Sequence, residues 1–279
     1  MRAAWWAGEK MRENRMMKGC GLVWLAGLVM FFGTGVLRAA EPVQVRVLCY
    51  NIHHGEGLDR KLDLERIAKV IQSVEPDLVT LQEVDQNASR SGSVDQPAEL
   101  ARLTGMLVAF GPNIPLQGGH YGNAVLSKYP IANHRNELLP NFDNGEQRGV
   151  LSAELTISGR NQPLLLLATH LDSRRDDRER LASAKAINQI VSESPRRPAL
   201  LAGDMNDVLN SPTLDELETM WTRVNEQVMP TTPVANPRRQ IDFILFRPSN
   251  SWKLIEVKVL DEAVASDHRP IFAVLELVQ

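Results

Sequence analysis

The chain has 279 residues, enough for one sizeable core and too few for two large domains. It carries 31 basic and 34 acidic residues, and six of the basic and two of the acidic ones lie in residues 1–40. Residues 41–279 therefore hold 31 − 6 = 25 basic against 34 − 2 = 32 acidic residues, a net charge of −7. This balance argues against a tight, nonspecific nucleic-acid-binding protein, although a local basic patch remains compatible with it.

The first forty residues differ from the rest. Five basic residues precede an uncharged apolar stretch, Gly21–Leu37, and Arg38-Ala39-Ala40 then leads into Glu41-Pro42. A basic start, an apolar middle and small residues at the end predict a signal peptide over 1–40 and an exported protein, periplasmic or secreted. The alternative is an N-terminal membrane anchor formed by residues 21–37. After cleavage only Cys49 remains, so no internal disulfide is possible.

From residue 41 onward, strands and helices alternate. Asp63 precedes apolar residues at helical spacing, and further helices are expected at 97–103, after Asp176 or Asp177, and at 212–217. Residues 85–97 are expected to form a surface loop, and 130–147 show no clear pattern. The predicted strands are 44–52, 77–81, 122–126, 148–157, 164–168, 241–246, 254–260 and 271–278, and a further strand is predicted to end at the glycine within 200–206. Adjacent strands near 148–168 suggest hairpins, so mixed sheets of an α+β protein are expected.

One stretch organises the functional prediction. Leu200-Leu201-Ala202 is an apolar run that reaches Gly203 and then presents Asp204 and Asn206. Residues two apart at a strand end point the same way, so both side chains should project from the rim of a sheet. A carboxylate beside an amide suits the holding of a water molecule next to an anion.

Polar residues follow other predicted strands in the same way. Asn51, Glu83, His170 with Asp172, and Asp267 with His268 each lie at or beside a strand end. Asp242 lies inside the apolar run 241–245, where a carboxylate is costly unless it is paired. His268 is the expected partner, because a buried aspartate orients a histidine and raises its basicity. An ion pair of Asp242 with Arg238 or Arg239 is the alternative.

These motifs resemble those of the endonuclease/exonuclease/phosphatase superfamily. Asn51, Leu81-Gln82-Glu83, Thr169-His170-Leu171-Asp172, Gly203-Asp204-Met205-Asn206, Ile241-Asp242-Phe243-Ile244 and Ser266-Asp267-His268-Arg269-Pro270 occur in the superfamily's order. The resemblance covers about residues 45–277. It implies a four-layer αββα sandwich, with two mixed β-sheets face to face and helices outside, over a catalytic domain spanning 41–279.

The resemblance also implies roles for these residues. Glu83 resembles the principal ligand of Mg²⁺ (or Mn²⁺), with Asn51 and Asp267 as neighbouring ligands. Asp204 resembles the residue that positions or deprotonates the attacking water, and Asn206 would hold that water or a phosphoryl oxygen. His268, oriented by Asp242, would contact the phosphate, and His170 would contact its other oxygens or assist the leaving group.

Four further residues are predicted to touch the substrate. Asn123 resembles a family position near the phosphate, with a tight turn into a strand as its alternative. Arg148 is expected to hold a phosphate or to be solvated. Asp172 follows His170. His53 stands where apurinic endonucleases carry an acidic residue. One of His53 and His54 is expected to face the metal, and the other to be a satisfied polar residue. This departure weakens a DNA-repair interpretation.

The predicted function is that of an exported, Mg²⁺-dependent phosphoesterase, a phosphodiesterase rather than a monoesterase. One alternative is a secreted nuclease acting on DNA or RNA. Another, of a different class, is a non-catalytic protein that binds a phosphate ligand on the same scaffold. The expected partner is a phosphoester substrate (a phosphodiester, lipid head group or nucleic acid), and a monomer without an obligate protein partner is expected. Specificity is expected to lie in the loops at 85–97, 111–121, 139–147 and 228–240.

Overall fold

The computed structural model describes residues 42–278. The signal peptide or anchor predicted for residues 1–40 lies outside this range. Within the described residues, no helix is long and apolar enough to cross a membrane.

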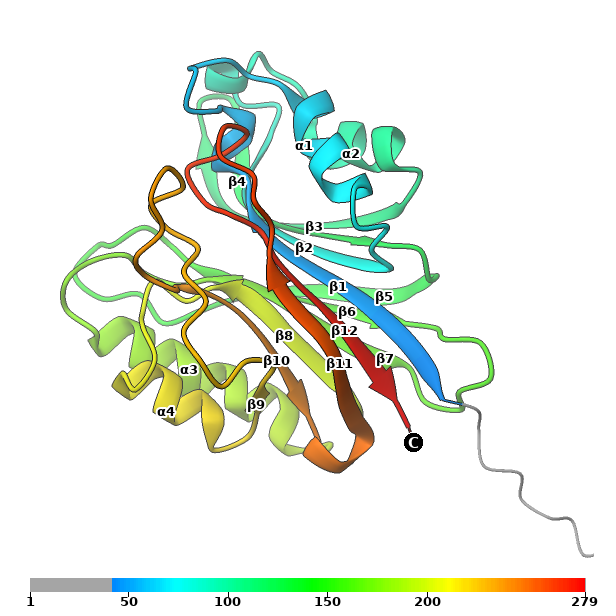
Figure 1. Cartoon of the computed structure of the whole chain (residues 1–279). Helices are drawn as coiled ribbons and strands as arrows, with labels where there is room; N and C mark the ends of the chain where they lie inside the picture. The colour runs from blue at the N-terminus through cyan, green and yellow to red at the C-terminus, as the bar shows by residue number, and fades with distance from the viewer. Residues whose placement is uncertain (1–41, 279) are drawn as a thin grey trace, which may run out of the picture. The chain divides into compact units, whose positions relative to one another are not determined.

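Two six-stranded sheets form the centre of the domain (Figure 1). The first sheet contains, in spatial order, β11 (Trp252–Val259), β12 (Ile271–Leu277), β1 (Val43–Asn51), β2 (Leu78–Gln86), β4 (Gly119–Ser127) and β3 (Leu107–Leu116). The second contains β5 (Ile131–Leu138), β6 (Gly149–Leu155), β7 (Leu164–His170), β8 (Ala199–Asp204), β10 (Asp242–Arg247) and β9 (Thr222–Arg223). Each sheet has one parallel pair, β1–β2 or β7–β8, among antiparallel neighbours. Both sheets are therefore mixed, as predicted.

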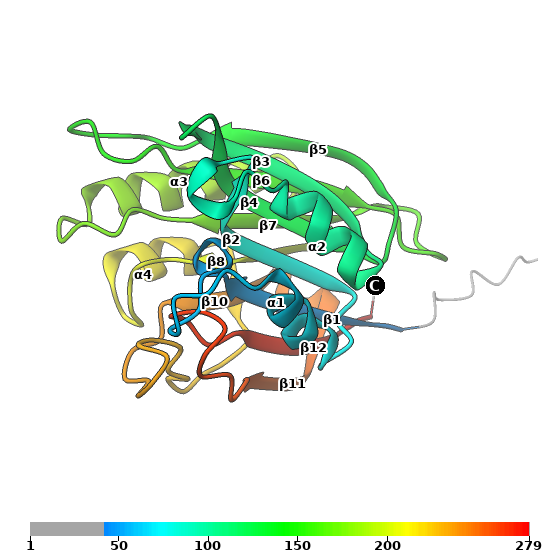
Figure 2. The ribbon, with the colours of Figure 1, turned by 90° about the horizontal axis from the view of Figure 1, so that it is seen from above.

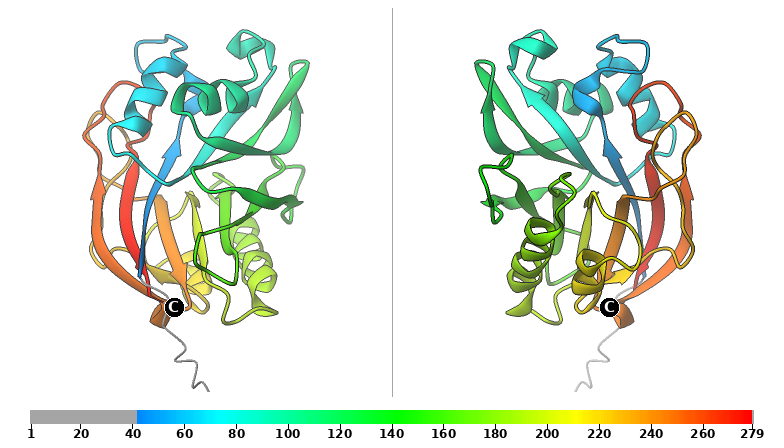
Figure 3. Two further views of the ribbon diagram at one scale, coloured as in Figure 1. Left: turned by 90° about the vertical axis from the view of Figure 1, so that its right-hand side faces the viewer. Right: turned by 90° about the vertical axis from the view of Figure 1, so that its left-hand side faces the viewer.

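Helices cover the outer faces of both sheets. In Figure 2, α1 (Leu64–Gln72) and α2 (Gln96–Thr104) lie across the first sheet. Figure 3 shows α3 (Arg178–Ser192) and α4 (Pro212–Glu218) on the second sheet, on the side away from α1 and α2. Short 3₁₀ turns are formed by His53–Gly55, Ser89–Ser91 and Ser249–Ser251. The predicted four-layer αββα sandwich is thus confirmed.

Strand alternation explains how the layers hold together. In β7, Leu164, Leu166 and Ala168 join the core between the two sheets, while Leu165 and Leu167 pack under α3 and α4. Because successive strand residues point to opposite faces, a strand covered on both faces needs a continuous apolar run. The same alternation places Val47 between the sheets and Leu48 under α1 and α2.

The structure corrects several predicted boundaries. Strands β3, β5 and the two-residue β9 were not predicted, and β2 continues past Glu83 to Gln86. The segment 85–97 is not a plain surface loop, because Asp85 is fully buried in β2 and Gln96 begins α2. Strand β8 also does not end at Gly203. A Cβ atom there would lie 2.1 Å from the carbonyl oxygen of Thr169 on β7, so the glycine permits close strand pairing.

Candidate active site

Strand pairing brings the predicted residues to one end of the two sheets. In the parallel pair β1–β2, Asn51 is level with Gln82, so Glu83 follows at the same edge. In the parallel pair β7–β8, His170 is level with Asp204. Strand β10 runs antiparallel to β8 and begins there, with Asp242 level with Asp204. The loop before β12 adds Asp267 and His268.

Glu83 lies at a bulge in strand β2. The pairing of β2 with β4 shifts register between Leu81 and Val84, and Glu83 has a left-handed backbone with φ of 59°. A β-bulge breaks the strict alternation of side chains and redirects one of them. Glu83 Oε1 accepts a hydrogen bond from Asn51 Nδ2 at 3.1 Å. The bulge therefore turns the carboxylate toward the end of β1 while β2 continues beyond it.

Asp204 is the centre of the cluster, with 1% of its surface exposed. It accepts hydrogen bonds from Asn51 Nδ2 at 3.1 Å and from the Asn206 backbone N–H at 2.8 Å. His170 Nε2 and His268 Nε2 lie 3.5 and 3.8 Å from its Oδ2. Burial, followed by the negative charge of Asp242, raises the pKa of Asp204 to about 7. A carboxylate with this pKa is suited to accepting a proton near neutral pH.

Asn206 and Asp204 do not share a face in the way that strand alternation predicted. Asn206 lies in the turn after β8, with φ of 48°, a conformation that asparagine adopts more readily than most residues. Its side-chain Nδ2 donates to the carbonyl oxygen of Leu171 at 3.0 Å. Both residues nevertheless border the same cavity, because the turn brings Asn206 back over the strand end.

Asp242 and His268 form the expected pair. Asp242 Oδ2 lies 2.9 Å from His268 Nδ1 and also accepts from the Thr231 hydroxyl at 2.5 Å. Burial alone would lower the pKa of His268, but the charge and hydrogen bond of Asp242, with Asp204 and Asp267, outweigh it and raise this pKa to about 10. His268 is therefore an imidazolium at neutral pH, and Nδ1–H donates to Asp242 while Nε2–H faces Asp204.

His170 has the opposite protonation state. It is 4% exposed, and burial, together with the positive charges of Arg148 and His268, holds its pKa well below the ordinary value of 6.5. It is therefore neutral when His268 is charged. Two histidines on either side of one carboxylate, with pKa values shifted in opposite directions, are typical of sites that transfer protons.

A cavity of about 310 Å³ opens over this cluster. Arg148 lies in its wall, 5% exposed, with Nη1 2.8 Å from Glu146 Oε1. The Arg148 Nε atom is buried and has no hydrogen-bond partner among residues 42–278. The cavity is lined by Glu83, Arg90, Ile114, Leu116, Tyr121, Glu146, Arg148, His170, Ser173, Asp204, Asn206 and His268.

Two residues predicted to touch the substrate lie elsewhere. Asn123 is buried on β4 and donates to the carbonyl oxygen of Gly149 at 3.1 Å, which links the two sheets. Asp172 is buried, and its Oδ1 accepts a hydrogen bond from Arg174 Nε at 2.9 Å beside the start of α3. Neither borders the cavity. Their polar atoms are used in holding neighbouring segments together, so the structure does not support substrate contact for either residue.

The sequence-based prediction placed specificity in the loops 85–97 and 111–121 but did not name the residues of these segments that line the cavity. Arg90 makes a two-bonded ion pair with buried Asp85, at 2.8 Å for both contacts, and its guanidinium lies over the Tyr121 ring at 5.3 Å. Ile114, Leu116 and Tyr121 come from the hairpin of β3 and β4. That hairpin turns at Gln117-Gly118, with φ of 46° and 87°. A two-residue turn ending in glycine between apolar segments was the signal that could have revealed it.

The residues on the metal side fit a divalent cation. Glu83 is half-buried, and burial with the nearby charge of Asp267 raises its pKa. No lysine or arginine within residues 42–278 is paired with the Glu83 carboxylate. Its Oε1 instead accepts a hydrogen bond from the side-chain amide of Asn51. A half-buried carboxylate beside a second one is stabilised by a cation, and carboxylate oxygens are the ligands of Mg²⁺ and Mn²⁺. Asn51 contacts Glu83 and Asp204 through its nitrogen, so its role as a direct ligand stays a prediction.

Comparison with known proteins agrees with this arrangement. The Endonuclease/Exonuclease/phosphatase family model matches residues 48–268. The protein YbhP of Escherichia coli (strain K12) is 28% identical over 251 residues, covering 85% of this chain and 98% of YbhP. A 5'-tyrosyl-DNA phosphodiesterase of Caenorhabditis elegans is 24% identical over 182 residues, 62% of this chain and 46% of that protein.

A solved structure shares the fold. The crystal structure of an endonuclease/exonuclease/phosphatase from Beutenbergia cavernae has a TM-score of 0.70 and 26% identity, covering 84% of this chain and 72% of that one. The family match includes Glu83, Asp204, Asp242 and His268, the residues that strand pairing gathers at one end of the sandwich. With its sequence, its fold and this cluster in agreement, the chain belongs to the endonuclease/exonuclease/phosphatase family.

Proposed function

We propose that this chain is an exported, metal-dependent phosphodiesterase. The observation that carries the proposal is the buried Asp204 carboxylate, whose Oδ2 lies 3.5 Å from His170 Nε2 and 3.8 Å from His268 Nε2 at the floor of a polar cavity. The pKa of Asp204, raised to about 7 by burial and by Asp242, supports the same role. Members of the family are phosphoesterases and nucleases that depend in general on a divalent metal. The basic start and apolar stretch of residues 1–40 support export.

In the proposed reaction, Asp204 accepts a proton from a water molecule that attacks phosphorus. Asn206 holds that water through its amide oxygen, since its nitrogen already donates to Leu171. The bond from phosphorus to the leaving oxygen breaks as the bond to the water oxygen forms. His268 Nε2–H and Arg148 donate to the phosphoryl oxygens, where negative charge increases. A divalent cation held by Glu83 and Asp267 would neutralise part of that charge.

The small number of free cations in the cavity favours a diester over a monoester. Arg90 is already neutralised by Asp85, and Arg148 is paired with Glu146. A phosphodiester carries one negative charge and a monoester up to two, so the diester needs fewer unpaired basic groups. The same pairing weighs against a nuclease, which needs cations along a nucleic-acid backbone. The match to a DNA phosphodiesterase keeps a secreted nuclease as the second candidate.

The test is hydrolysis of bis-p-nitrophenyl phosphate with and without EDTA, beside p-nitrophenyl phosphate. Turnover of the diester should be lost in EDTA and restored by Mg²⁺ or Mn²⁺. Asp204→Asn should lower the rate by roughly 10²- to 10⁴-fold, the usual contribution of a general base. Asp215→Asn, at an exposed position in the first turn of α4, is the matched control. Normal turnover by Asp204→Asn protein would contradict the proposal.

A substrate panel then separates the candidates. It contains supercoiled DNA, RNA, sphingomyelin, phosphatidylinositol phosphates and simple phosphodiesters, all with Mg²⁺. Cleavage of DNA or RNA that falls steeply with salt would favour the nuclease. Binding of phosphate ligands without turnover of any of them would favour a non-catalytic binding protein on this scaffold.

A further inference from the structure

A pair of adjacent histidines lies on the metal side of the cluster. His53 and His54 follow β1 in a short 3₁₀ turn, and both have left-handed backbones, with φ of 46° and 45°. This conformation is energetically costly for a residue other than glycine and persists only where the surroundings impose it. Two consecutive strained histidines in a family site indicate that the position of their rings matters.

Hydrogen bonds hold this turn in place. The His53 backbone N–H donates to Asn51 Oδ1 at 3.1 Å, and Gln96 Nε2 donates to the carbonyl oxygen of His54 at 2.7 Å. Gly55 has a left-handed backbone with φ of 80°, and a Cβ atom there would lie 2.9 Å from Leu64 Cδ2, so the turn packs closely against α1. The turn is thus fixed from β1, from α1 and from α2, and the two rings are positioned before any ligand arrives.

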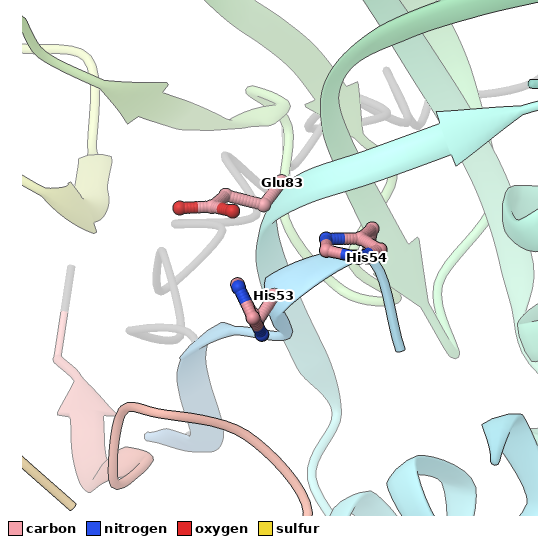
Figure 4. A group of neighbouring side chains, drawn as sticks. All are labelled: His53, His54 and Glu83. Carbon is pink, nitrogen blue, oxygen red and sulfur yellow. The ribbon is translucent and has the colours of Figure 1, made fainter. Parts of the chain in front are cut away.

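Both histidine rings lie near Glu83. His53 Nδ1 lies 3.0 Å from the carbonyl oxygen of Glu56; it donates there, which leaves its Nε2 with a free lone pair. His54 Nδ1 is buried with no hydrogen-bond partner among the described residues. One ligand atom from each of His53, His54 and Glu83 lies within 4.8 Å of the other two. Figure 4 shows the rings, carried by the turn after β1, beside the Glu83 carboxylate on the neighbouring strand.

We propose that His53, His54 and Glu83 form a site for a transition-metal ion of the Zn²⁺ or Co²⁺ class. Two imidazole nitrogens and one carboxylate suit such ions, whereas Mg²⁺ takes oxygen ligands and retains water. The backbone carbonyl of Glu56 acts on His53 as an outer partner that fixes tautomer and ring orientation. Glu83 is shared with the proposed phosphodiesterase site, so the inference adds a preference for one metal class to that site.

The first test uses Co²⁺ alone as a probe of the metal-free full chain. One equivalent should give the intense visible absorption of a Co²⁺ ion with nitrogen ligands and low coordination number, and excess Mg²⁺ should not remove it. A weak spectrum like that of hydrated Co²⁺ would overturn the proposal. This measurement requires no variant and no substrate, so it can fail while the phosphodiesterase proposal stands, and the reverse also holds.

The second test uses His53→Asn and His54→Asn, because asparagine tolerates the left-handed backbone of this turn. Each substitution should weaken Zn²⁺ binding, measured by calorimetry, by at least roughly 10- to 100-fold, the loss seen when even supporting partners of a metal ligand are removed. Mg²⁺ binding should be unchanged. His134→Asn, at an exposed position on β5, is the matched control. Zn²⁺ binding equal to that of the unaltered protein in both variants would refute the site.

Discussion

Replacing Asp242 by asparagine should move the pH profile of activity to lower pH. The side chain keeps its size and can still accept from His268 Nδ1, but it loses the charge that most strongly raises the pKa of His268 to about 10 from 6.5. Without that charge, burial still lowers the His268 pKa while the charges of Asp204 and Asp267 still raise it, so this pKa should fall from about 10 toward its ordinary value of 6.5.

The size of the effect follows from the protonated fraction of His268. At pH 8 nearly all of the unaltered protein carries the imidazolium, and a group with a pKa of 6.5 is then about 3% protonated. The rate at pH 8 should therefore fall by up to about 30-fold, and the loss should be much smaller at pH 5.5. The charge of Asp242 also raises the pKa of Asp204, so its loss should move the acid limb of the pH profile to lower pH as well.

The assay is kcat/KM for bis-p-nitrophenyl phosphate between pH 5 and 10, with an NMR titration of the His268 ring. Thr231→Val removes the other hydrogen bond to Asp242 Oδ2 without changing its charge, so it should leave both limbs near their original positions. A uniformly slower Asp242→Asn enzyme with limbs at unchanged pH would refute the reasoning, since it would assign Asp242 a purely structural role.

Three further predictions concern stability and binding. The folded-state pKa of His268 is raised, so the contribution of this residue to stability is complete below pH 6.5 and is lost as the pH rises through about 10. The unfolding temperature, measured in EDTA, should therefore fall over this pH range. A rise in the unfolding temperature would contradict the assignment. Gly203→Ala should destabilise the fold by about 1–3 kcal/mol in urea unfolding, because its Cβ would meet the Thr169 carbonyl oxygen at 2.1 Å; an unchanged midpoint would refute this. Arg148→Gln should raise KM for the diester by roughly 10- to 100-fold, the value of a charged hydrogen bond, whereas exposed Arg135→Gln should not; equal KM values would remove Arg148 from the substrate site.

The sequence predicts well where burial and local chemistry act together. The run 164–168 is apolar at every position because β7 is covered on both faces. Asp63 caps α1, accepting from the Arg66 N–H at 2.8 Å. The Asp242–His268 pair was predictable because a carboxylate inside an apolar strand needs a partner.

The missed strands lack such signals. Strand β5 is an edge strand with mostly exposed residues between Ala132 and Arg135, so it has little apolar pattern. Strand β3 contains Pro112 and Pro115, which are tolerated because it too lies at an edge. Edge strands are defined by their neighbours more than by their own residues.

The missed site residues depend on long-range geometry. Arg90 reaches the cavity only because β2 continues past the bulge at Glu83 and buries Asp85. Tyr121 enters it through the pairing of β4 with β2 and β3. The left-handed turn at His53 and His54 likewise depends on contacts with Gln96 and Leu64. None of these contacts is encoded in a short segment.

The Asn51 amide has a consequence for folding. Its nitrogen donates to Glu83 of the first sheet and to Asp204 of the second. His268, in the loop before β12 of the first sheet, pairs with Asp242 of the second. The chain passes from the first sheet to the second at β5 and returns to the first sheet at β11. Neither sheet alone contains a complete site. The recovery of the proposed phosphodiesterase activity during refolding would therefore report the docking of the two sheets, which secondary-structure signals do not register.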